Sequence, residues 1–392
     1  MSSIKKVTYK TTTGYRARWR TPDGRSRSKT FEKKRDAEKF LTSVDNAVLT
    51  GAYIDPGAGK ITFKEYAERW RSSQVHRPGT AKQIEGNLRL HVYPRLGHRA
   101  MGSIQRRHIQ ELVRHLLDGD QSQGRRPLAP TTTVLIYTWI STIFKAAVSD
   151  RVRPDSPCQH VSLPTVERPK VVPLAVETIE ALIAGFPARY RATIPLGAGT
   201  GVRLSEALGL TNDRIDWMRR EVTIDRQLTG SAGGRPEFGP VKDRRNRPRK
   251  IPMSQWVVDA LAEHIAQFGL GPEGLVFTSD TGGPLWRTTY ADNWRRVAIP
   301  LGVPLGDGYH ELRHFYASAL IRDGRSVKEV QERLGHHSAQ MTLDIYAHLW
   351  PEDDDRTRDA IDGLFMRPDA TGPVTVRDAG CQDRVNDDYR AG

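Results

Sequence analysis

The sequence predicts a multidomain, mainly α protein: a small N-terminal three-stranded β-sheet plus helix, an all-α domain, and an α+β domain in the C-terminal half. The chain has 392 residues, which is long enough for two or three domains with separate cores. Apolar residues recur at helical spacing along most of it, whereas the alternation typical of strands is confined to short segments. Segments 53–59 and 155–173 are rich in Pro or Gly and are predicted linkers. We therefore expect domains at 1–55, 62–165 and 172–366, and a tail at 367–392.

Residues 4–31 alternate basic, β-branched and aromatic side chains, with breaks at Gly14 and at the turn 21–24. This pattern predicts three short antiparallel strands. A helix is expected from about residue 33 to 50, because Ala37, Phe40, Leu41 and Val44 fall on one face. The strands also carry five arginines: Arg16, Arg18, Arg20, Arg25 and Arg27. Cations interleaved with Tyr and Trp favour a DNA-binding sheet over an ordinary solvated face.

Residues 62–152 have a helical pattern throughout, which predicts an all-α unit of four helices. The apolar positions at helical spacing include Phe63, Tyr66, Ala67 and Trp70, then Ile84, Leu88 and Val92, then Ile109, Leu112, Val113 and Leu116. The fourth helix is expected at 131–148. Stripes of this kind indicate a packed core, and the loops between them are basic at 106–108 and 125–126.

The C-terminal region mixes helices and strands. Helices are expected at 176–185, near 192–197, and in series from 255 to about 364, with strands at 221–228 and 249–252. The tail after Arg367 is rich in Gly, Asp and Arg and has few apolar residues, so it is predicted to be disordered.

The distribution of charge indicates a polyanionic partner. Lys and Arg outnumber Asp and Glu by 60 to 46, with a net charge of +8 in residues 1–60 and −5 in residues 352–392. The chain has 2 cysteines, Cys158 and Cys381, which excludes a disulfide framework or a Cys-based zinc cluster. The sequence shows no signal peptide and no segment approaching the ~20 apolar residues of a membrane span. We therefore expect a cytoplasmic protein with no membrane partner.

The run His310-Glu311-Leu312-Arg313-His314 fits two chemistries. As HExxH it resembles a zinc-hydrolase motif, with Glu329 or Glu332 as a conceivable third ligand. However, Arg313 would share the face of the metal and repel a dication, and the positions of the longer zinc motif hold Ala317 and Leu320. As HxxRH it places two histidines and an arginine on one helical face, which suits a phosphate.

Three other segments could contribute chemistry. Residues 197–203 hint at a dinucleotide loop, but Val202 replaces the third glycine and a helix precedes the segment, so that interpretation is rejected. Arg203 and Glu206 lie three residues apart on a predicted helix, where they can form an ion pair. Lys242 lies at a hairpin tip, from which it can reach a substrate as a proton donor. Gly335 ends the helix 327–334 and presents His336 at its C-terminus.

These motifs occur in one order: TGVRLSEAL at 200–208, the Lys242 hairpin, HELRH, LGHH at 334–337, and Tyr346 ten residues after His336. Their order and spacing resemble the tyrosine recombinase (phage integrase) family. The resemblance extends over nearly the whole chain. It implies an arm-type DNA-binding module at the N-terminus, a helical core-binding (SAM-like) domain and a catalytic domain of the tyrosine recombinase type.

The resemblance implies a role for each motif. Tyr346 would be the nucleophile that forms a 3′-phosphotyrosine, and Arg203 and Arg313 would grip the non-bridging phosphate oxygens. Lys242, with Lys250 as the alternative, would protonate the leaving 5′-oxygen. His310 and His336 would be the phosphate-binding and base residues, with His337 adjacent as a rival for the second position. Glu206 would support Arg203. No metal or other cofactor is implied.

The expected function is site-specific DNA recombination by an integrase of a phage or other mobile element, through a Holliday junction. The expected partners are double-stranded DNA, at core-type and arm-type attachment sites, and three further copies of the chain in a homotetramer on DNA. A host DNA-bending protein and a directionality factor are candidate accessory proteins. The expected location is the nucleoid in the cytoplasm of a bacterial host. A catalytically inactive DNA-binding protein of the same fold and a zinc-dependent hydrolase using HELRH are the alternatives.

Overall fold

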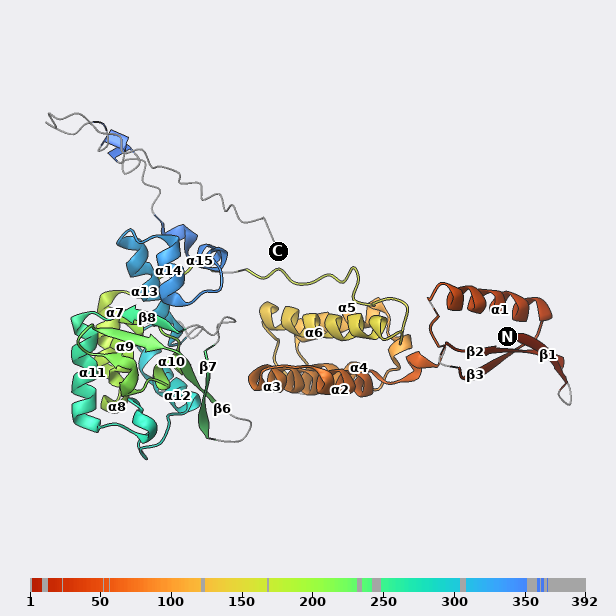
Figure 1. Cartoon of the computed structure of the whole chain (residues 1–392), viewed down its shortest axis with the longest axis horizontal. Coiled ribbons are helices and arrows are strands. Elements are labelled where there is room, and N and C mark those ends of the chain that lie inside the picture. The colour runs from red at the N-terminus through yellow and green to blue at the C-terminus, as the bar shows by residue number, and fades with distance from the viewer. Residues whose placement is uncertain are drawn as a thin grey trace, which may run out of the picture.

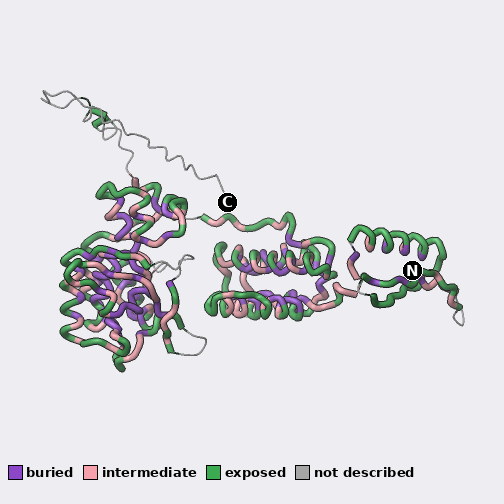
Figure 2. The backbone as a smooth tube through the Cα atoms, in the orientation of Figure 1, coloured by how far each residue is buried: buried purple, intermediate pink, exposed green. Residues whose placement is uncertain are grey.

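The computed structural model describes residues 2–365, apart from 9–12, 23, 52, 56, 121–123, 168, 231–234, 242–247, 304–307, 351–357, 360 and 363–364. Within these residues the buried hydrophobic side chains gather into three cores, one in each of three successive units of the chain. Figure 1 shows these units as separate bodies, and Figure 2 shows buried residues concentrated inside each one. The chain is mainly helical with a small N-terminal sheet, as the sequence predicted.

The N-terminal unit is a three-stranded antiparallel sheet covered on one face by a helix. Its elements are β1 (Ser3–Thr8), β2 (Thr13–Arg20), β3 (Ser26–Phe31) and α1 (Lys34–Leu49), with β2 in the centre. Ala17 and Trp19 of β2 are buried with Ala37 and Leu41 of α1. The Trp19 indole donates a hydrogen bond of 2.8 Å to the hydroxyl of Tyr53. The strands and the helix thus follow the sequence prediction.

The middle unit is all-α. It contains α2 (Phe63–Ser73), α3 (Pro78–Asn87), a π-helical segment (Leu88–Val92), α4 (Tyr93–Leu96), α5 (Arg106–Asp118) and α6 (Pro130–Ser149). Thr62 and Glu65 cap the start of α2 by exchanging hydrogen bonds between side chains and backbone. Phe63 and Phe144 pack with rings 5.5 Å apart, at the centre of the core.

Helix α6 corrects one expectation from the sequence. Its 20 residues are long and apolar enough to cross a membrane by length and composition. Ile136, Ile140, Ile143 and Phe144 nevertheless lie buried in the core of the middle unit. A central helix of a small bundle is apolar on several faces, so its composition approaches that of a membrane segment.

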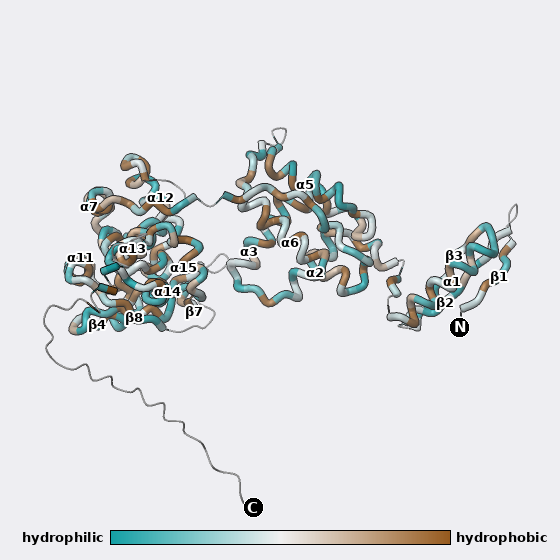
Figure 3. The backbone as a smooth tube through the Cα atoms, turned by 90° about the horizontal axis from the view of Figure 1, so that it is seen from above, coloured by the Kyte–Doolittle hydropathy of each residue, from teal (hydrophilic) through white to brown (hydrophobic). Residues whose placement is uncertain are grey.

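The C-terminal unit combines helices with two small sheets. The helices are α7 (Val176–Gly185), α8 (Ala188–Arg191), α9 (Thr193–Thr200), α10 (Leu204–Leu208), α11 (Gln255–Phe268), α12 (Arg287–Ala298), α13 (His310–Arg322), α14 (Val327–Leu334) and α15 (Ala339–Tyr346). The strands are β4 (Ile215–Asp216), β5 (Glu221–Ile224), β6 (Arg226–Gly230), β7 (Pro236–Pro240) and β8 (Arg249–Pro252). One sheet has the antiparallel order β4-β5-β8 and the other is the hairpin β6-β7. In Figure 3, α13, α14 and α15 lie together in this unit.

The strand expected at 221–228 is two strands in the structure. It breaks at Asp225, whose carboxylate accepts hydrogen bonds from Arg214 and Arg226. The break lets β5 pair with β8 while β6 pairs with β7. Residues 197–199 lie inside α9, as the rejection of a dinucleotide loop requires. A Cβ atom at Gly197 would come within 2.7 Å of the Tyr309 hydroxyl, so the glycine serves close packing.

The last long helix that the structure describes is α15, followed by a short 3₁₀ turn (Ala347–Leu349). The expected tail at 367–392 lies outside the described residues.

Candidate active site

A buried carboxylate links two arginines of the C-terminal unit. Arg203 is the N-cap of α10, and its Nη1 donates to Oε1 of Glu206 at 2.9 Å, so the ion pair expected from their spacing is formed. The backbone N–H of Arg203 donates to Oε2 at 2.9 Å. Arg249, on β8, donates from Nη1 to Oε1 at 3.2 Å and from Nη2 to Oε2 at 2.5 Å. Glu206 therefore fixes both guanidinium groups.

The Glu206 side chain has no exposed surface. Burial alone would raise the pKa of its carboxyl, but the charges of Arg249, then Arg203 and Arg313, outweigh burial and lower the pKa to about 2. Glu206 is accordingly a carboxylate over the whole physiological pH range.

Arg313 is buried near the middle of the same region, with 1% of its surface exposed. Its Nη1 donates to the carbonyl of Gly201 at 2.6 Å, and its Nη2 donates to the carbonyl of Leu334 at 2.6 Å. Burial, followed by the charges of Arg203 and Arg249, lowers the pKa of Arg313 to about 9, so the group remains charged at neutral pH.

The two carbonyls that hold Arg313 belong to the last turns of helices. Gly201 follows α9 with φ of 65° and Gly335 follows α14 with φ of 66°, the left-handed conformation that favours glycine. Carbonyls at a helix C-terminus lack intrahelical partners and lie at the negative end of the helix dipole. They therefore suit a buried cation. The carbonyl of Gly335 also accepts a long hydrogen bond, 3.4 Å, from Arg203 Nη2.

Two histidines beside the arginines have lowered pKa values. Burial, then the charges of Arg313 and other neighbours, lowers the pKa of His310 to about 3, and burial and Arg313 do the same for His336. Both rings are thus neutral at pH 7. Nδ1 of His336 lies 2.9 Å from the hydroxyl oxygen of Thr342, whereas His337 is exposed.

Tyr346 is the last residue of α15, and 1% of its surface is exposed. Its hydroxyl lies 2.8 Å from Nδ1 of His314. Its ring stacks on that of His336, with an interplanar angle of 12° and centroids 6.4 Å apart. The tyrosine, the histidines and the arginines therefore form one cluster at the meeting of α9, α10, α13, α14 and α15.

The structure brings together six of the predicted site residues: Arg203, Glu206, His310, Arg313, His336 and Tyr346. Lys242 lies outside the described residues. Lys250 is exposed on β8, where its carbonyl accepts a hydrogen bond from Arg333. The sequence prediction missed Arg249, which no local pattern marks. It placed His314 on one helical face with His310 and Arg313, but gave it no part in the recombination reaction.

The zinc interpretation lacks a donor set in the described part of the chain. There, no group of three His, Cys, Asp or Glu side chains lies close enough to hold a metal ion. Glu332, one of the conceivable third ligands, is exposed on α14 and pairs with Lys328 at 3.0 Å. Nδ1 of His314 is engaged with Tyr346.

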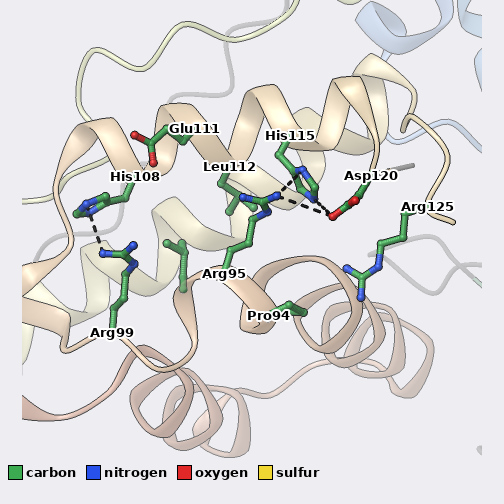
Figure 4. A pocket seen from close by; sticks show the side chains of 10 residues that line it. Pro94, Arg95, Arg99, His108, Glu111, Leu112, His115, Asp120 and Arg125 are labelled. Atoms are coloured by element: carbon green, nitrogen blue, oxygen red, sulfur yellow. Dashed lines mark hydrogen bonds and ion pairs between the residues drawn. The ribbon is translucent and has the colours of Figure 1, made fainter. Parts of the chain in front are cut away.

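A second basic region lies in the middle unit, around a cavity of about 320 Å³ between α4 and α5 (Figure 4). Its cationic or imidazole side chains are Arg95, Arg99, His108, His115 and Arg125. Arg95 lies 2.8 Å from Nδ1 of His115, and both approach Asp120 at about 4 Å. Burial and the neighbouring arginines lower the pKa of His108 and of His115. The three arginines outnumber the two carboxylates of the lining, Glu111 and Asp120, so the cavity carries a small excess of positive charge that suits an anion.

Comparison with known proteins identifies the family. The model of the phage integrase family matches residues 168–352, and the model of the phage integrase N-terminal SAM-like domain matches residues 62–117, together more than half of the chain. The chain belongs to the phage integrase family.

Relatives and solved structures agree with this family. The integrase of Mycobacterium phage L5 is 24% identical over 326 residues, which cover 80% of this chain and 84% of the relative. A XerC-like tyrosine recombinase of Caldanaerobacter subterraneus is 23% identical over 366 residues, covering 85% and 90%. Among solved structures, the Tn1549 transposon integrase in complex with a circular intermediate DNA matches with a TM-score of 0.65 at 22% identity, covering 78% of this chain and 99% of that one. A lambda integrase dimer bound to a COC′ core site matches with a TM-score of 0.56 at 15% identity, covering 90% and 95%. The last two show that the fold is shared.

This integrase is a tyrosine-type site-specific recombinase, as the order of its motifs predicted. The geometry of the cluster indicates how its side chains can act on a phosphate. A guanidinium fixed by a carboxylate, as in Arg203, and one fixed by carbonyls at helix ends, as in Arg313, can hold phosphate oxygens without rearranging.

Replacing Glu206 should destabilise the C-terminal unit in a pH-dependent way. The pKa of Glu206 is lower in the folded protein than its ordinary value of 4.5. Its contribution to the free energy of unfolding is therefore present above pH 4.5 and is lost as pH falls toward 2. We expect Glu206→Gln to cost on the order of 3 kcal/mol at neutral pH, and the difference to shrink below about pH 5. Calorimetry of the intact integrase at several pH values measures this. Glu263→Gln, on the exposed face of α11, is the control. A loss of stability in Glu206→Gln that does not depend on pH would contradict the lowered pKa of Glu206.

Proposed function

We propose that this integrase cuts and rejoins DNA by transferring a scissile phosphate to Tyr346, as part of the integration of a phage or other mobile element. The observation that supports this proposal is the cluster itself. The hydroxyl of a buried tyrosine lies in the same group of side chains as two arginines that are fixed by Glu206 and by helix C-termini. The covalent 3′-phosphotyrosine conserves the energy of the phosphodiester, so that rejoining needs no external energy source.

The two arginines would hold the non-bridging oxygens of the phosphate. The side chain of Arg203 is 22% exposed, whereas Arg313 is buried, so DNA would approach from the side of Arg203. Phosphoryl transfer builds negative charge on the equatorial oxygens, and planar guanidinium groups stabilise it. His310 and His336 are neutral and would donate hydrogen bonds to the phosphate. Lys242, with Lys250 as the alternative, is the proposed acid for the leaving 5′-oxygen.

Residues 62–165 are the proposed core-binding domain and residues 172–366 the proposed catalytic domain. The basic cavity of the middle unit supports a contact with DNA phosphates through Arg95, Arg99 and Arg125. A lambda integrase tetramer bound to a Holliday junction matches with a TM-score of 0.54 at 17% identity, covering 82% of this chain. By analogy, we propose a tetramer on two DNA duplexes.

Residues 1–55 are the proposed arm-type DNA-binding domain. In β2, Arg16, Arg18 and Arg20 alternate with the residues that α1 covers, so they project from the opposite face. Arg25 is exposed at the turn before β3. Arg27 differs from the others, because it lies opposite Trp19 in the sheet and its guanidinium pairs with Asp55. DNA would therefore contact the face of Arg16, Arg18 and Arg20.

The proposed location is the nucleoid in the cytoplasm of a bacterial host, where the DNA substrate lies. A host DNA-bending protein and a directionality factor are proposed accessory partners, since one chain that binds both arm-type and core-type sites requires the DNA between them to bend. The net charge of +14 supports a polyanionic partner.

The central test is capture of the covalent intermediate. Nicked duplexes that tile the DNA adjoining the gene would be incubated with the integrase and resolved under denaturing conditions. We expect a protein–DNA adduct that is absent in Tyr346→Phe, because that variant lacks the attacking oxygen. DNA binding without an adduct would indicate a catalytically inactive protein. Loss of hydrolytic activity on chelation would support the zinc alternative.

The adjacent histidines provide a matched pair. His336 is buried against Tyr346 and Thr342, whereas His337 is exposed. We expect His336→Ala to slow adduct formation by about 10²-fold, as loss of a positioned donor does. His337→Ala should change the rate by less than about twofold, the usual effect of a surface substitution. Equal losses in the two variants would contradict the assignment of His336.

The N-terminal sheet can be tested with another matched pair. Arg18→Ala should weaken binding to arm-type DNA and reduce the slope of log K against log salt by about one, because one phosphate contact is lost. Arg27→Ala should have a smaller effect, since Arg27 pairs with Asp55 on the other side of the sheet. Titrations of the intact integrase at several salt concentrations measure both. The reverse order of effects would place DNA on the face covered by α1.

A further inference from the structure

The hydroxyl of Tyr346 is hydrogen-bonded to His314, a histidine to which the proposed function gives no role. We propose that His314 is a catalytic residue, which holds the Tyr346 hydroxyl and accepts its proton as the oxygen attacks the phosphate. This inference rests on the proposed function, since it concerns the same reaction at the same tyrosine.

The contact between His314 and Tyr346 has the geometry of a hydrogen bond. Nδ1 of His314 lies 2.8 Å from the Tyr346 hydroxyl, and the two rings meet at 65° with centroids 5.5 Å apart. His314 is 6% exposed, on the buried face of α13. A phenol that donates to Nδ1 requires the imidazole proton on Nε2, so a neutral His314 has its lone pair directed at the reacting oxygen.

A tyrosine nucleophile needs such a partner. The unperturbed phenol pKa is ~10, so only about one molecule in a thousand is ionised at neutral pH. Three other side chains of the cluster are poorly suited to take its proton. Arg203 and Arg313 are cations that only donate. His336 stacks on the ring of Tyr346, and its Nδ1 bonds to Thr342.

Every proton and bond in the cleavage step is accounted for. The O–H bond of Tyr346 breaks, its electron pair forms the bond from oxygen to phosphorus, and the proton moves to Nδ1 of His314. The bond from phosphorus to the 5′-oxygen breaks, and that oxygen takes a proton from the acid, the role proposed for Lys242. Rejoining reverses each transfer, and His314 returns the proton to the tyrosine.

The charges around His314 would make its protonation depend on whether DNA is bound. Arg313 and His310 lie on its own helix, Tyr346 on α15, His336 at the end of α14 and Arg203 at the start of α10. A charged imidazole is unfavourable beside Arg313 alone. A bound phosphate adds negative charge to the same region, so protonation of His314 becomes less costly when DNA is present.

The test compares His314→Asn with the unmodified integrase, using the nicked duplexes described above. An asparagine amide can accept the hydrogen bond near the position of Nδ1 but cannot take the proton. At neutral pH we expect adduct formation to slow by about 10²- to 10³-fold while binding of the same duplex is retained. His337→Asn, which changes an exposed histidine in the link between α14 and α15, is the matched control.

The pH profile separates proton transfer from a structural role. The rate in His314→Asn should rise about tenfold per pH unit up to about pH 10, because solvent must then remove the proton. The unmodified integrase should level off at a lower pH. A loss that is equal at every pH, or no loss, overturns the proposal. If the unmodified integrase forms no adduct with any duplex, the proposed function fails and this inference fails with it.

A second measurement leaves His314 in place, in case its variants do not fold. A fluorinated tyrosine at position 346 makes the phenol more acidic. If His314 accepts the proton, the inflection of the pH profile belongs to a histidine and should stay where it is. If the phenol ionises without His314, the inflection should move down with the pKa of the phenol, which would overturn the proposal.

Discussion

The carboxylate of Glu206 lies without exposed surface between Arg203 and Arg249, and the charge of Arg313 acts on it as well. Three guanidiniums in one buried region repel one another, and each loses hydration. A single carboxylate that is hydrogen-bonded to two of them offsets much of this repulsion. It also joins parts of the chain that are distant in sequence, since Arg203 begins α10 and Arg249 lies on β8.

Two helix ends complete the arrangement. The chain turns at Gly201 and at Gly335 in the left-handed conformation, and each turn leaves carbonyls directed at an arginine. The same turns place Arg203 two residues after Gly201 and His336 directly after Gly335. A side chain at Gly201 would approach the ring of Tyr316 to 2.5 Å, so both space and conformation require glycine there. Arg203 and His336, both proposed to act on the phosphate, thus lie at helix termini, where local backbone geometry is well determined.

Much of this arrangement follows from local sequence patterns. The pair Arg203 and Glu206 was predictable from its i,i+3 spacing, and His310 with Arg313 from the period of a helix. Arg249 was not predictable, because its position depends on the pairing of β8 with β5, about 25 residues earlier in the chain. The division of the strand at Asp225 was missed for a related reason. The alternation of side chains continues across the break, and tertiary ion pairs decide where the backbone turns. Helix α6 was predicted at nearly its observed bounds, but its resemblance in length and composition to a membrane span was missed. Its apolar content follows from burial in a bundle.

The electrostatics of the site also indicate where sequence recognition must reside. The cluster combines three guanidiniums with one carboxylate and with histidines that burial and the neighbouring charges keep neutral. Its excess positive charge is stabilised by any phosphodiester, whatever the adjacent base. The cluster can therefore determine the chemistry without determining the DNA sequence. Selectivity must then come from surfaces that contact bases or sense DNA shape, and the helical middle unit and the N-terminal sheet are the surfaces proposed above to contact DNA. The proposed chemistry at the cluster and the recognition of a particular DNA sequence are therefore separate properties of the chain.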